Sequence, residues 1–479
     1  MDEKAKKPFA KRPMNKQNKQ HDKVPAPKDK AVTKPQPPSA RAAACLLLAQ
    51  VLDEGAYTNI ALNKFLRYYG LSDVERRLLT ELVRGTVKAL ETIDWYLQKC
   101  VSRPLSQIEK KVLHILRLSV YQLLYMERIP NSAAVNEAVK LARKASGEGS
   151  AKFVNGVLRG LLRKQEAGEL AFPAESEDDA GYLSLKYCHP RWLVKRWLGP
   201  WGREGTERLL AFDNTVAPMC LRVNTLVMSR DELLARLTEA GAEAVPSKWC
   251  ADGVVCSKLP ALGEVFAKLN NAFYVQDESS MLVGGVVAPP VGGRVLDMCS
   301  APGGKTTHLA QLMEDKGEII ACDIHEHKLQ LIADNAQRLG LTCIKPMLND
   351  GLVFRPNWSE AFDRVLVDAP CSGLGVLRRR AEARWRKERK DLKLFPPLQL
   401  AILHNASRYV KPGGRLIYST CTIEQSENHY LIEDFLAKHP EWQRAPLKHP
   451  LTGELVEELQ LLPQNDGIDG FYICALEKK

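Results

Sequence analysis

Apolar residues in the N-terminal third of the chain repeat with a helical period. In residues 39–165 they recur three and four positions apart, for example at Val112 and Leu116, which places them on one face of a helix. No segment of this part alternates as a strand would. We therefore predict an all-α domain of five to seven helices, one of them capped by Asn131 or Ser132 just after a proline.

The next part of the chain mixes the helical and the strand period. After the acidic, low-complexity segment E-A-G-E-L-A-F-P-A-E-S-E-D-D-A-G, residues 182–290 contain the helix pattern R-W-L-V-K-R-W-L and a capping box, S-R-D-E, that begins at Ser229. They also contain the strand patterns M-C-L-R-V-N and D-G-V-V-C. We predict a small α+β domain here.

From Arg294 onward, short apolar runs alternate strictly with helical segments. The apolar runs are R-V-L-D-M-C, E-I-I-A-C-D-I, C-I-K-P-M-L-N-D, F-D-R-V-L-V-D and G-R-L-I-Y-S-T-C, and one of the helices between them ends at Gly340. Near-continuous apolar strands that alternate with helices predict a parallel, doubly wound, Rossmann-like α/β sheet covered on both faces. Ligands of such sheets gather at the carboxyl ends of the strands.

The length of 479 residues is too great for one hydrophobic core and suits three domains. We expect a disordered basic tail in residues 1–39, the all-α domain in 40–168, the α+β domain in 180–290 and the α/β domain in 291–479. The apolar stretch A-A-A-C-L-L-L-A-Q-V-L is too short to span a bilayer, and no apolar run follows the basic start closely enough to form a signal peptide. These features predict a cytoplasmic protein.

The net charge of +11 is concentrated in two segments. Residues 1–39 carry a net charge of +7 and residues 378–393 a net charge of +6, which leaves the remainder close to neutral. Localised positive charge suits a polyanion, because each neutralised phosphate releases counterions. A solubilising role explains the tail equally well. For residues 378–393, which we call the basic arm, we predict contacts with nucleic acid.

The twelve cysteines predict neither disulfides nor a metal site. None lies in a C-x-x-C pair, and no Cys/His group has zinc-finger spacing. His325 and His327 flank Glu326 but do not form the metal-binding helix pattern H-E-x-x-H. We predict no metal, with most of the thiols buried in a reducing compartment.

The segment D-M-C-S-A-P-G-G-K-T, residues 297–306, follows the first strand of the α/β domain. It partly matches the phosphate-binding P-loop, G-x-x-x-x-G-K-[ST], but the first glycine that this motif requires falls on Cys299. We therefore predict that the loop does not hold a triphosphate. Its two glycines still allow a ligand to approach the backbone closely.

Aspartates stand at the ends of three later strands, at Asp323, Asp350 and Asp368. Asp323, nineteen residues after Gly304, can hold both hydroxyls of a ribose, and Asp350 is placed to face an adenine amino group. Helix capping could explain one such aspartate, but not three beside A-P-G-G-K-T. Because carboxylates repel phosphates and suit a cationic nucleoside, the predicted cofactor is S-adenosylmethionine.

Two strands are also followed by a thiol. Cys371 lies in D-A-P-C-S-G-L-G and Cys421 in S-T-C-T. By residue type alone, either thiol could be a nucleophile. A thiol of ordinary pKa is only slightly ionised at neutral pH, so such a site must be electropositive. Lys305 and the basic arm are the candidates to supply that field.

These motifs, together with Q-D-E-S-S at Gln276 and D-G-F-Y at Asp469, resemble those of the Nop/Sun family of RNA 5-methylcytosine methyltransferases. The helical part, with K-F-V-N-G-V-L-R at Lys152, resembles the antitermination factor NusB. The resemblance covers roughly residues 40–479. It implies a monomer, with an RNA-binding NusB-like domain, that uses S-adenosylmethionine to methylate carbon-5 of cytosine in small-subunit (16S) ribosomal RNA.

The resemblance also implies roles for single residues. Carbon-5 of cytosine attacks a methyl sulfonium only after a thiolate has added to carbon-6. In the family the cysteine of the T-C pair adds, which is Cys421 here, while Cys371 assists release of the product. Asp368 would contact the ring near N3, with Lys305 close by. The implied cofactor pocket consists of Cys299, Ser300, Ala301, Pro302, Gly303, Gly304, Lys305, Asp323, Asp350 and Asp368.

Two alternative functions remain at this point: methylation of transfer RNA by the same chemistry, and a non-catalytic RNA-binding factor in ribosome assembly, which would have no need of both thiols.

The family's His-Pro-Asp in the arm is replaced by Arg380-Ala381-Glu382. We therefore expect a mobile, helical arm, with Trp385 either stacking on a base or packing the arm down. The glycines after Cys371 are expected to leave room for a flipped nucleotide.

Overall fold

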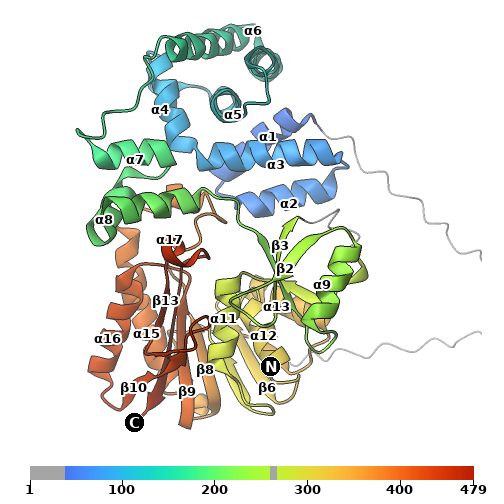
Figure 1. Cartoon of the computed structure of the whole chain (residues 1–479), viewed down its shortest axis with the longest axis vertical. Helices are drawn as coiled ribbons and strands as arrows, with labels where there is room; N and C mark the ends of the chain where they lie inside the picture. Colours follow the sequence, from blue (N-terminus) through green and yellow to red (C-terminus); the bar gives the residue numbers. More distant parts are fainter. Residues whose placement is uncertain (1–37, 259–266) are drawn as a thin grey trace, which may run out of the picture.

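The computed structural model describes residues 38–258 and 267–479. The disorder predicted for residues 1–39 concerns residues that, except for the last two, lie outside the described part. Figure 1 shows the N-terminal helices stacked at one end of the long axis and the large C-terminal sheet at the other, with α7 (Asp179–Tyr187) and α8 (Arg191–Asp213) between them. Within the described residues, no helix is both long and apolar enough to cross a membrane.

The N-terminal part is all-α, as predicted, and forms one hydrophobic core. Its α-helices are α1 (Ala40–Leu52), α2 (Thr58–Tyr68), α3 (Asp73–Lys88), α4 (Leu90–Cys100), α5 (Lys110–Tyr125) and α6 (Asn131–Glu166), the last of which kinks at Gly147. The predicted cap of α6 was wrong. The capping position is Pro130, and no side chain caps the helix, because the fixed φ of proline starts the helix one residue earlier.

The middle part is a small α+β unit, as predicted. Its antiparallel sheet has the order β2-β3-β1-β4, with β1 (Met219–Val223), β2 (Glu243–Pro246), β3 (Gly253–Lys258) and β4 (Phe273–Val275). Helix α9 (Arg230–Glu239) starts with the predicted capping box between Ser229 and Glu232. The two predicted strand patterns, M-C-L-R-V-N and D-G-V-V-C, correspond to β1 and β3.

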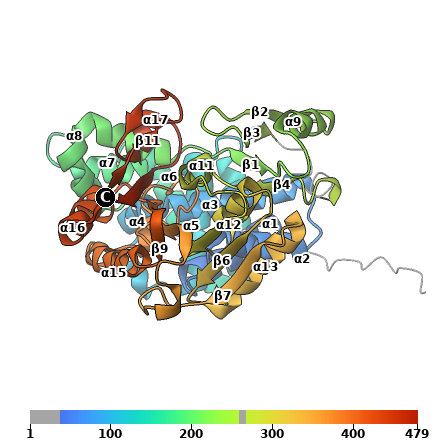
Figure 2. The same cartoon turned by 90° about the horizontal axis from the view of Figure 1, so that it is seen from below.

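The C-terminal part is a sheet in the order β10-β14-β9-β8-β5-β6-β7. Figure 2 views it from below, with the N-terminal helices behind. Its strands are β5 (Arg294–Asp297), β6 (Glu318–Asp323), β7 (Ile344–Leu348), β8 (Phe362–Asp368), β9 (Val410–Thr420), β10 (Trp442–Ala445) and β14 (Phe471–Lys478), and a short strand β13 (Leu459–Leu461) also pairs with β14. Its helices include α11 (Glu278–Val287), α12 (Gly304–Leu312), α13 (Glu326–Leu339), α15 (Phe395–Ser407) and α16 (His429–Lys438).

The five predicted strands β5 to β9 are parallel. Successive residues face opposite sides of the sheet, so Val295 and Leu296 of β5 enter separate cores, as expected for a sheet covered on both faces. The prediction missed β14, which runs antiparallel to β9, and β10 beyond it. The predicted end of α13 at Gly340 is confirmed by a left-handed capping residue there.

Candidate active site

The carboxyl ends of β5, β8 and β9 meet at one edge of the sheet. The chain proceeds from β5 outward to β7 and then returns to the other side of β5 as β8, which makes this edge the switch point where α/β sheets bind ligands. A cleft of about 310 Å³ opens there, which we call the strand-end cleft. Asp297, Lys305, Asp368 and Cys421 line it.

A buried ion pair joins the β5–α12 loop to the end of β8. Lys305 Nζ lies 2.7 Å from Asp368 Oδ2, and Ser419 Oγ donates a 2.9 Å hydrogen bond to Asp368 Oδ1. Burial alone would lower the pKa of Lys305, but the neighbouring carboxylate of Asp368 raises it overall. Lys305 therefore remains a cation inside the cleft. Its ammonium also lies 5.1 Å from the centre of the Phe471 ring.

The two predicted thiols are in contact: the Sγ atoms of Cys371 and Cys421 lie 3.3 Å apart. Their mutual hydrogen bond raises the pKa of Cys371 and lowers that of Cys421. Burial and the Asp368 carboxylate oppose the lowering at Cys421, whereas the positive charges of Arg380 and Lys305 add to it. These directions make Cys421 the more readily ionised of the two thiols. This asymmetry separates two thiols that residue type alone could not distinguish.

The loop that carries Cys371 is held by a buried carboxylate. Glu427 Oε2 accepts hydrogen bonds from the Ser372 backbone N–H and from Gln399 Nε2, both at 2.9 Å. The same Gln399 amide donates to the Pro370 carbonyl oxygen at 2.9 Å. Sequence reasoning missed Glu427, whose only signal was its position six residues after Cys421 on the chain.

Gly375, in the same loop, has a structural role. Gly470 N–H donates a 2.8 Å hydrogen bond to the Gly375 carbonyl oxygen, and a Cβ atom at Gly375 would overlap that neighbouring backbone. The expectation that the glycines leave room for a nucleotide is therefore wrong for Gly375. Its missing side chain lets the loop pack on the D-G-F-Y segment, while Gly373 adopts a left-handed φ of +70°.

Most of the predicted cofactor residues lie together. Those that line the strand-end cleft are Cys299, Ser300, Ala301, Pro302, Gly304, Lys305 and Asp368. Gly303 caps α12 with a φ of +98° and faces the α13 backbone, outside the lining. Asp323 and Asp350 lie at the same sheet edge, beyond the lining, and accept hydrogen bonds from the nearby backbone N–H groups of His325 and Leu352, each at 2.9 Å.

The cleft contains two acidic residues that the predicted set omitted, Asp277 and Asp297. Asp297 Oδ2 accepts a 2.7 Å hydrogen bond from Thr306, whereas Oδ1 is buried without a well-formed hydrogen bond. Burial raises the pKa of Asp297 to about 7. An incompletely paired carboxylate beside a glycine turn fits a ligand that carries a positive charge. The sequence signal was present, because Asp297 opens the motif that ends at Thr306.

Among the described residues, no group of three or more His, Cys, Asp or Glu side chains could hold a metal ion.

The basic arm is packed against the rest of the protein, which corrects the expectation of a mobile arm with its charge free for nucleic acid. Arg378 and Arg379 both pair with Asp469, and Arg384 is fully buried. Within the arm, the short helix α14 (Ala383–Arg386) and a single 3-10 turn (Asp391–Lys393) form. Arg380, Arg389 and Lys393 remain exposed.

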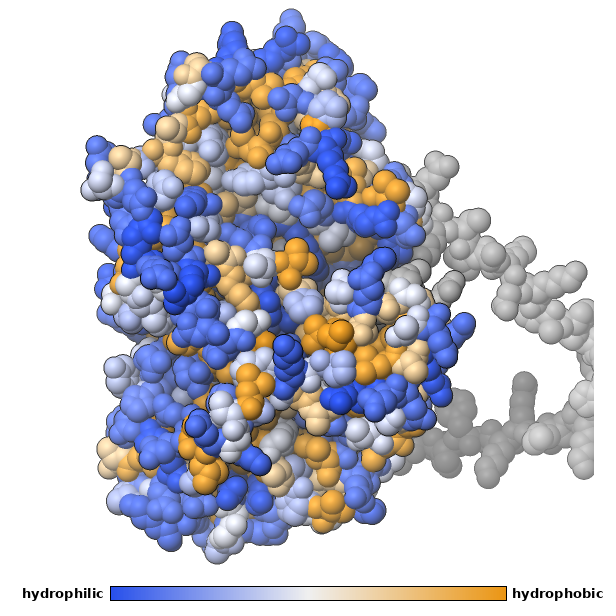
Figure 3. All heavy atoms as spheres, in the orientation of Figure 1, coloured by the Kyte–Doolittle hydropathy of each residue, from blue (hydrophilic) through white to orange (hydrophobic). Residues whose placement is uncertain are grey.

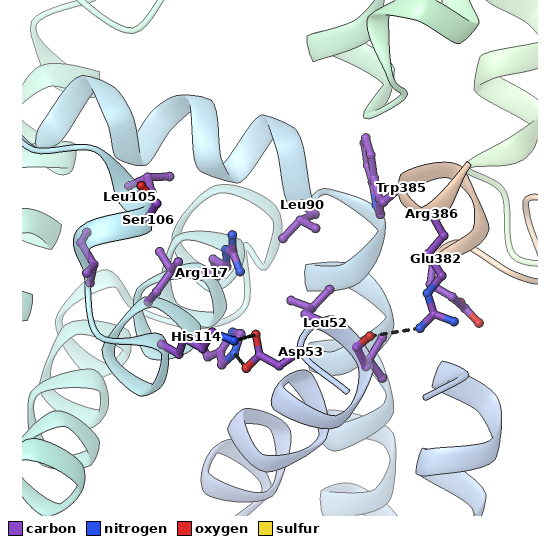
Figure 4. Close-up of a pocket in the computed structure, with 14 residues that line it drawn as sticks. Leu52, Asp53, Leu90, Leu105, Ser106, His114, Arg117, Glu382, Trp385 and Arg386 are labelled. Atoms are coloured by element: carbon purple, nitrogen blue, oxygen red, sulfur yellow. Dashed lines mark hydrogen bonds and ion pairs between the residues drawn. The ribbon is translucent and has the colours of Figure 1, made fainter. Parts of the chain in front are cut away.

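The arm joins the helical part to the catalytic part. Glu382, which stands where the family has an aspartate, accepts hydrogen bonds from the backbone N–H and hydroxyl of Thr58. Trp385 Nε1 donates a 2.6 Å hydrogen bond to the Val87 carbonyl oxygen, so the second alternative for Trp385, packing the arm down, is the one observed. Figure 4 shows Glu382, Trp385 and Arg386 entering a cavity of about 430 Å³ from one side and helical-domain residues lining it from the other.

Three family models match the chain. They are described as 16S rRNA methyltransferase RsmB/F (residues 285–477), NusB family (38–163) and a RsmF/B-like ferredoxin-like domain (189–260). The third model falls on the small α+β unit.

Similar proteins cover nearly the whole chain. A probable ribosomal RNA small subunit methyltransferase B of Bacillus subtilis (strain 168) is 39% identical, over 92% of this chain and 99% of its own length. A ribosomal RNA small subunit methyltransferase B of Klebsiella pneumoniae (strain 342) is 34% identical, over 92% and 98%. The solved structure of PH0851 aligns with a TM-score of 0.79 and 28% identity, over 93% of this chain and all of its own.

Proposed function

Because the chain belongs to the 16S rRNA methyltransferase RsmB/F family, we propose that it methylates carbon-5 of a cytosine in small-subunit ribosomal RNA, with S-adenosylmethionine as methyl donor. The names of its relatives support the ribosomal substrate. The observation that carries the cytosine chemistry is the 3.3 Å contact between Cys371 and Cys421, because Cys421 lines the same cleft as Lys305 and Asp368.

Cys421 is the proposed nucleophile. Its thiolate adds to carbon-6 of the cytosine, and the electron density moves through carbon-5 and the ring toward N3. Asp368 lies where a carboxyl group can contact N3, and Lys305 stabilises the negative charge that develops nearby. S-adenosylmethionine supplies an electrophilic methyl group for carbon-5 and would be held by Asp297, Asp368 and the loop that ends at Lys305.

Cys371 is the proposed partner in product release. After carbon-5 has passed its proton to solvent water, its electron pair restores the double bond to carbon-6, and the bond between carbon-6 and sulfur breaks with its electron pair returning to Cys421. The Cys371 thiol then donates a hydrogen bond to this leaving thiolate, across the 3.3 Å that separate the two sulfur atoms. Loss of Cys371 therefore makes the free thiolate less stable and favours the covalent adduct.

The test compares wild type with Cys421→Ala and Cys371→Ala. Each is incubated with 16S ribosomal RNA and S-adenosylmethionine and analysed on a denaturing gel for a protein–RNA adduct, and the methyl transfer is measured in parallel. We expect Cys371→Ala alone to accumulate the adduct and Cys421→Ala to give neither adduct nor product. An adduct in Cys421→Ala would reverse the two roles. Methyl transfer to transfer RNA but not to ribosomal RNA would change the substrate and leave the chemistry in place.

A further inference from the structure

Helix α2 carries a stripe of exposed side chains that the proposed chemistry does not use. The stripe consists of Tyr57, Ile60, Asn63, Lys64, Arg67 and Tyr68, spaced so that they share one face of the helix. Tyr57, Ile60 and Tyr68 are 54%, 64% and 60% exposed. A shallow groove of about 640 Å³ runs along the stripe. Large apolar side chains gathered on one exposed face indicate a surface that binds something.

The charges of the stripe indicate what it binds. Helix α2 contains Lys64 and Arg67 and no acidic residue. Cations spaced among aromatic rings can neutralise phosphates and stack on bases at the same time. Figure 3 shows apolar patches interrupting the polar surface along the junction between the helical part and the rest of the molecule.

The N-terminal end of the stripe lies beside the basic arm, whose first residues line the strand-end cleft. Asn59, in the first turn of α2, donates a 3.2 Å hydrogen bond to the carbonyl oxygen of Arg379, and Arg379 and Arg380 line the cleft. The guanidinium of Arg386 lies 5.3 Å from the centre of the Tyr57 ring. The arm thus connects the first turn of α2 directly to the site where the target base would bind.

We propose that the α2 stripe is a docking track for a single-stranded segment of the RNA substrate beside the target cytosine. Lys64 and Arg67 contact phosphates, and Tyr68 stacks on a base. This inference rests on the proposed function, because it assigns the stripe to the same RNA that the cleft modifies.

The experiment measures binding of a 16S ribosomal RNA transcript to the full chain, without cofactor, at several salt concentrations. The variants are Lys64→Ala/Arg67→Ala and Tyr68→Ala. The matched controls are Lys144→Ala/Lys152→Ala, two exposed lysines of α6, and Tyr430→Ala, an exposed tyrosine of α16 that contacts its neighbouring ring as Tyr68 does. Thermal melting verifies that every variant is folded, and the methylation rate is measured at saturating RNA.

We expect the double variant to lower the slope of log affinity against log salt by about 1.4, or about 0.7 for each lost phosphate contact. Tyr68→Ala should weaken binding by about fivefold or more. Both should keep the wild-type rate at saturating RNA, and the controls should match wild type. The inference is overturned if the stripe variants bind like wild type, or if the α6 control loses as much as they do. Failure of the proposed function would look different: wild type would bind RNA and methylate none.

Discussion

The hydrogen bond between the two thiols makes a quantitative prediction about the nucleophile. In Cys371→Ala the donor to the Cys421 thiolate is lost, whereas in Cys371→Ser a hydroxyl replaces it. A hydrogen bond to a charged group contributes about 1.5–3 kcal/mol, and one pKa unit corresponds to about 1.4 kcal/mol. The 3.3 Å contact should therefore be worth about one to two units of the Cys421 pKa.

The assay is alkylation of the free enzyme by iodoacetamide across a range of pH, with the modified Cys421 peptide quantified by mass spectrometry. The midpoint of the pH profile is the proper measurement, because a thiolate of higher pKa is intrinsically more reactive and partly masks the change in rate at any single pH. We expect the midpoint to rise by about one to two units in Cys371→Ala and to stay close to wild type in Cys371→Ser.

One result would refute this reasoning. If Cys371→Ala left the Cys421 midpoint unchanged, the neighbouring thiol would not stabilise the thiolate. Lys305 and Arg380, which also lower the pKa of Cys421, would then account for its ionisation alone, and Cys371 would need another role in release. A rise in both variants would instead show that a hydroxyl cannot replace the thiol as donor.

Three further predictions follow from single residues. Because burial raises the pKa of Asp297 to about 7, its charge appears as the pH rises through that value; S-adenosylmethionine should bind more tightly at pH 8 than at pH 6 in calorimetric titrations, with no such gain in Asp297→Asn. Burial also raises the pKa of Asp213 to about 7, so the folded state retains a proton that the unfolded state has lost; stability should fall between about pH 4 and pH 7, and urea titrations should show a shallower fall in Asp213→Asn. Gly375→Ala forces a Cβ against Gly470 and should lower the free energy of unfolding by about 1–3 kcal/mol, whereas Gly156→Ala, at an open helical position, should not lower it.

The sequence predicted the parallel strands because the apolar pattern of a buried strand can be read locally. That pattern is nearly unbroken in β6 and β8 but weak in the edge strand β7, where three of the five residues are exposed. The sequence also predicted that Asp368 and Cys421 would meet, since both follow parallel strands and β8 pairs with β9 so that Asp368 lies opposite Ser419. The C-terminal strand β14 is an equally apolar run. Its antiparallel direction depends on a long connection from α16, which no local pattern encodes.

The cofactor residues show the same division between local and distant information. Asp297 and Asp368 end the two strands at the switch point and line the cleft, whereas Asp323 and Asp350 follow the outer strands β6 and β7. In the sequence, each of these four strands has an aspartate at or just after its end. Only the order of the strands in the sheet places some of their aspartates nearer the thiols than others.

The basic arm shows how charge on a sequence can be misread. Its composition suggested a solvated face for RNA, yet Arg378 and Arg379 form ion pairs with the buried Asp469, and the buried Arg384 donates a hydrogen bond to the Cys188 carbonyl oxygen. Breaking such pairs would leave buried charges uncompensated, which is strongly unfavourable, so the arm is fixed where it lies. Because its first residues line the cleft while Glu382, Trp385 and Arg386 hold the helical part, this single segment sets the distance between α2 and the nucleophile. If RNA docks on α2 as proposed, it would meet Cys421 at a fixed distance, and this geometry would select one cytosine without any contact that reads its neighbours.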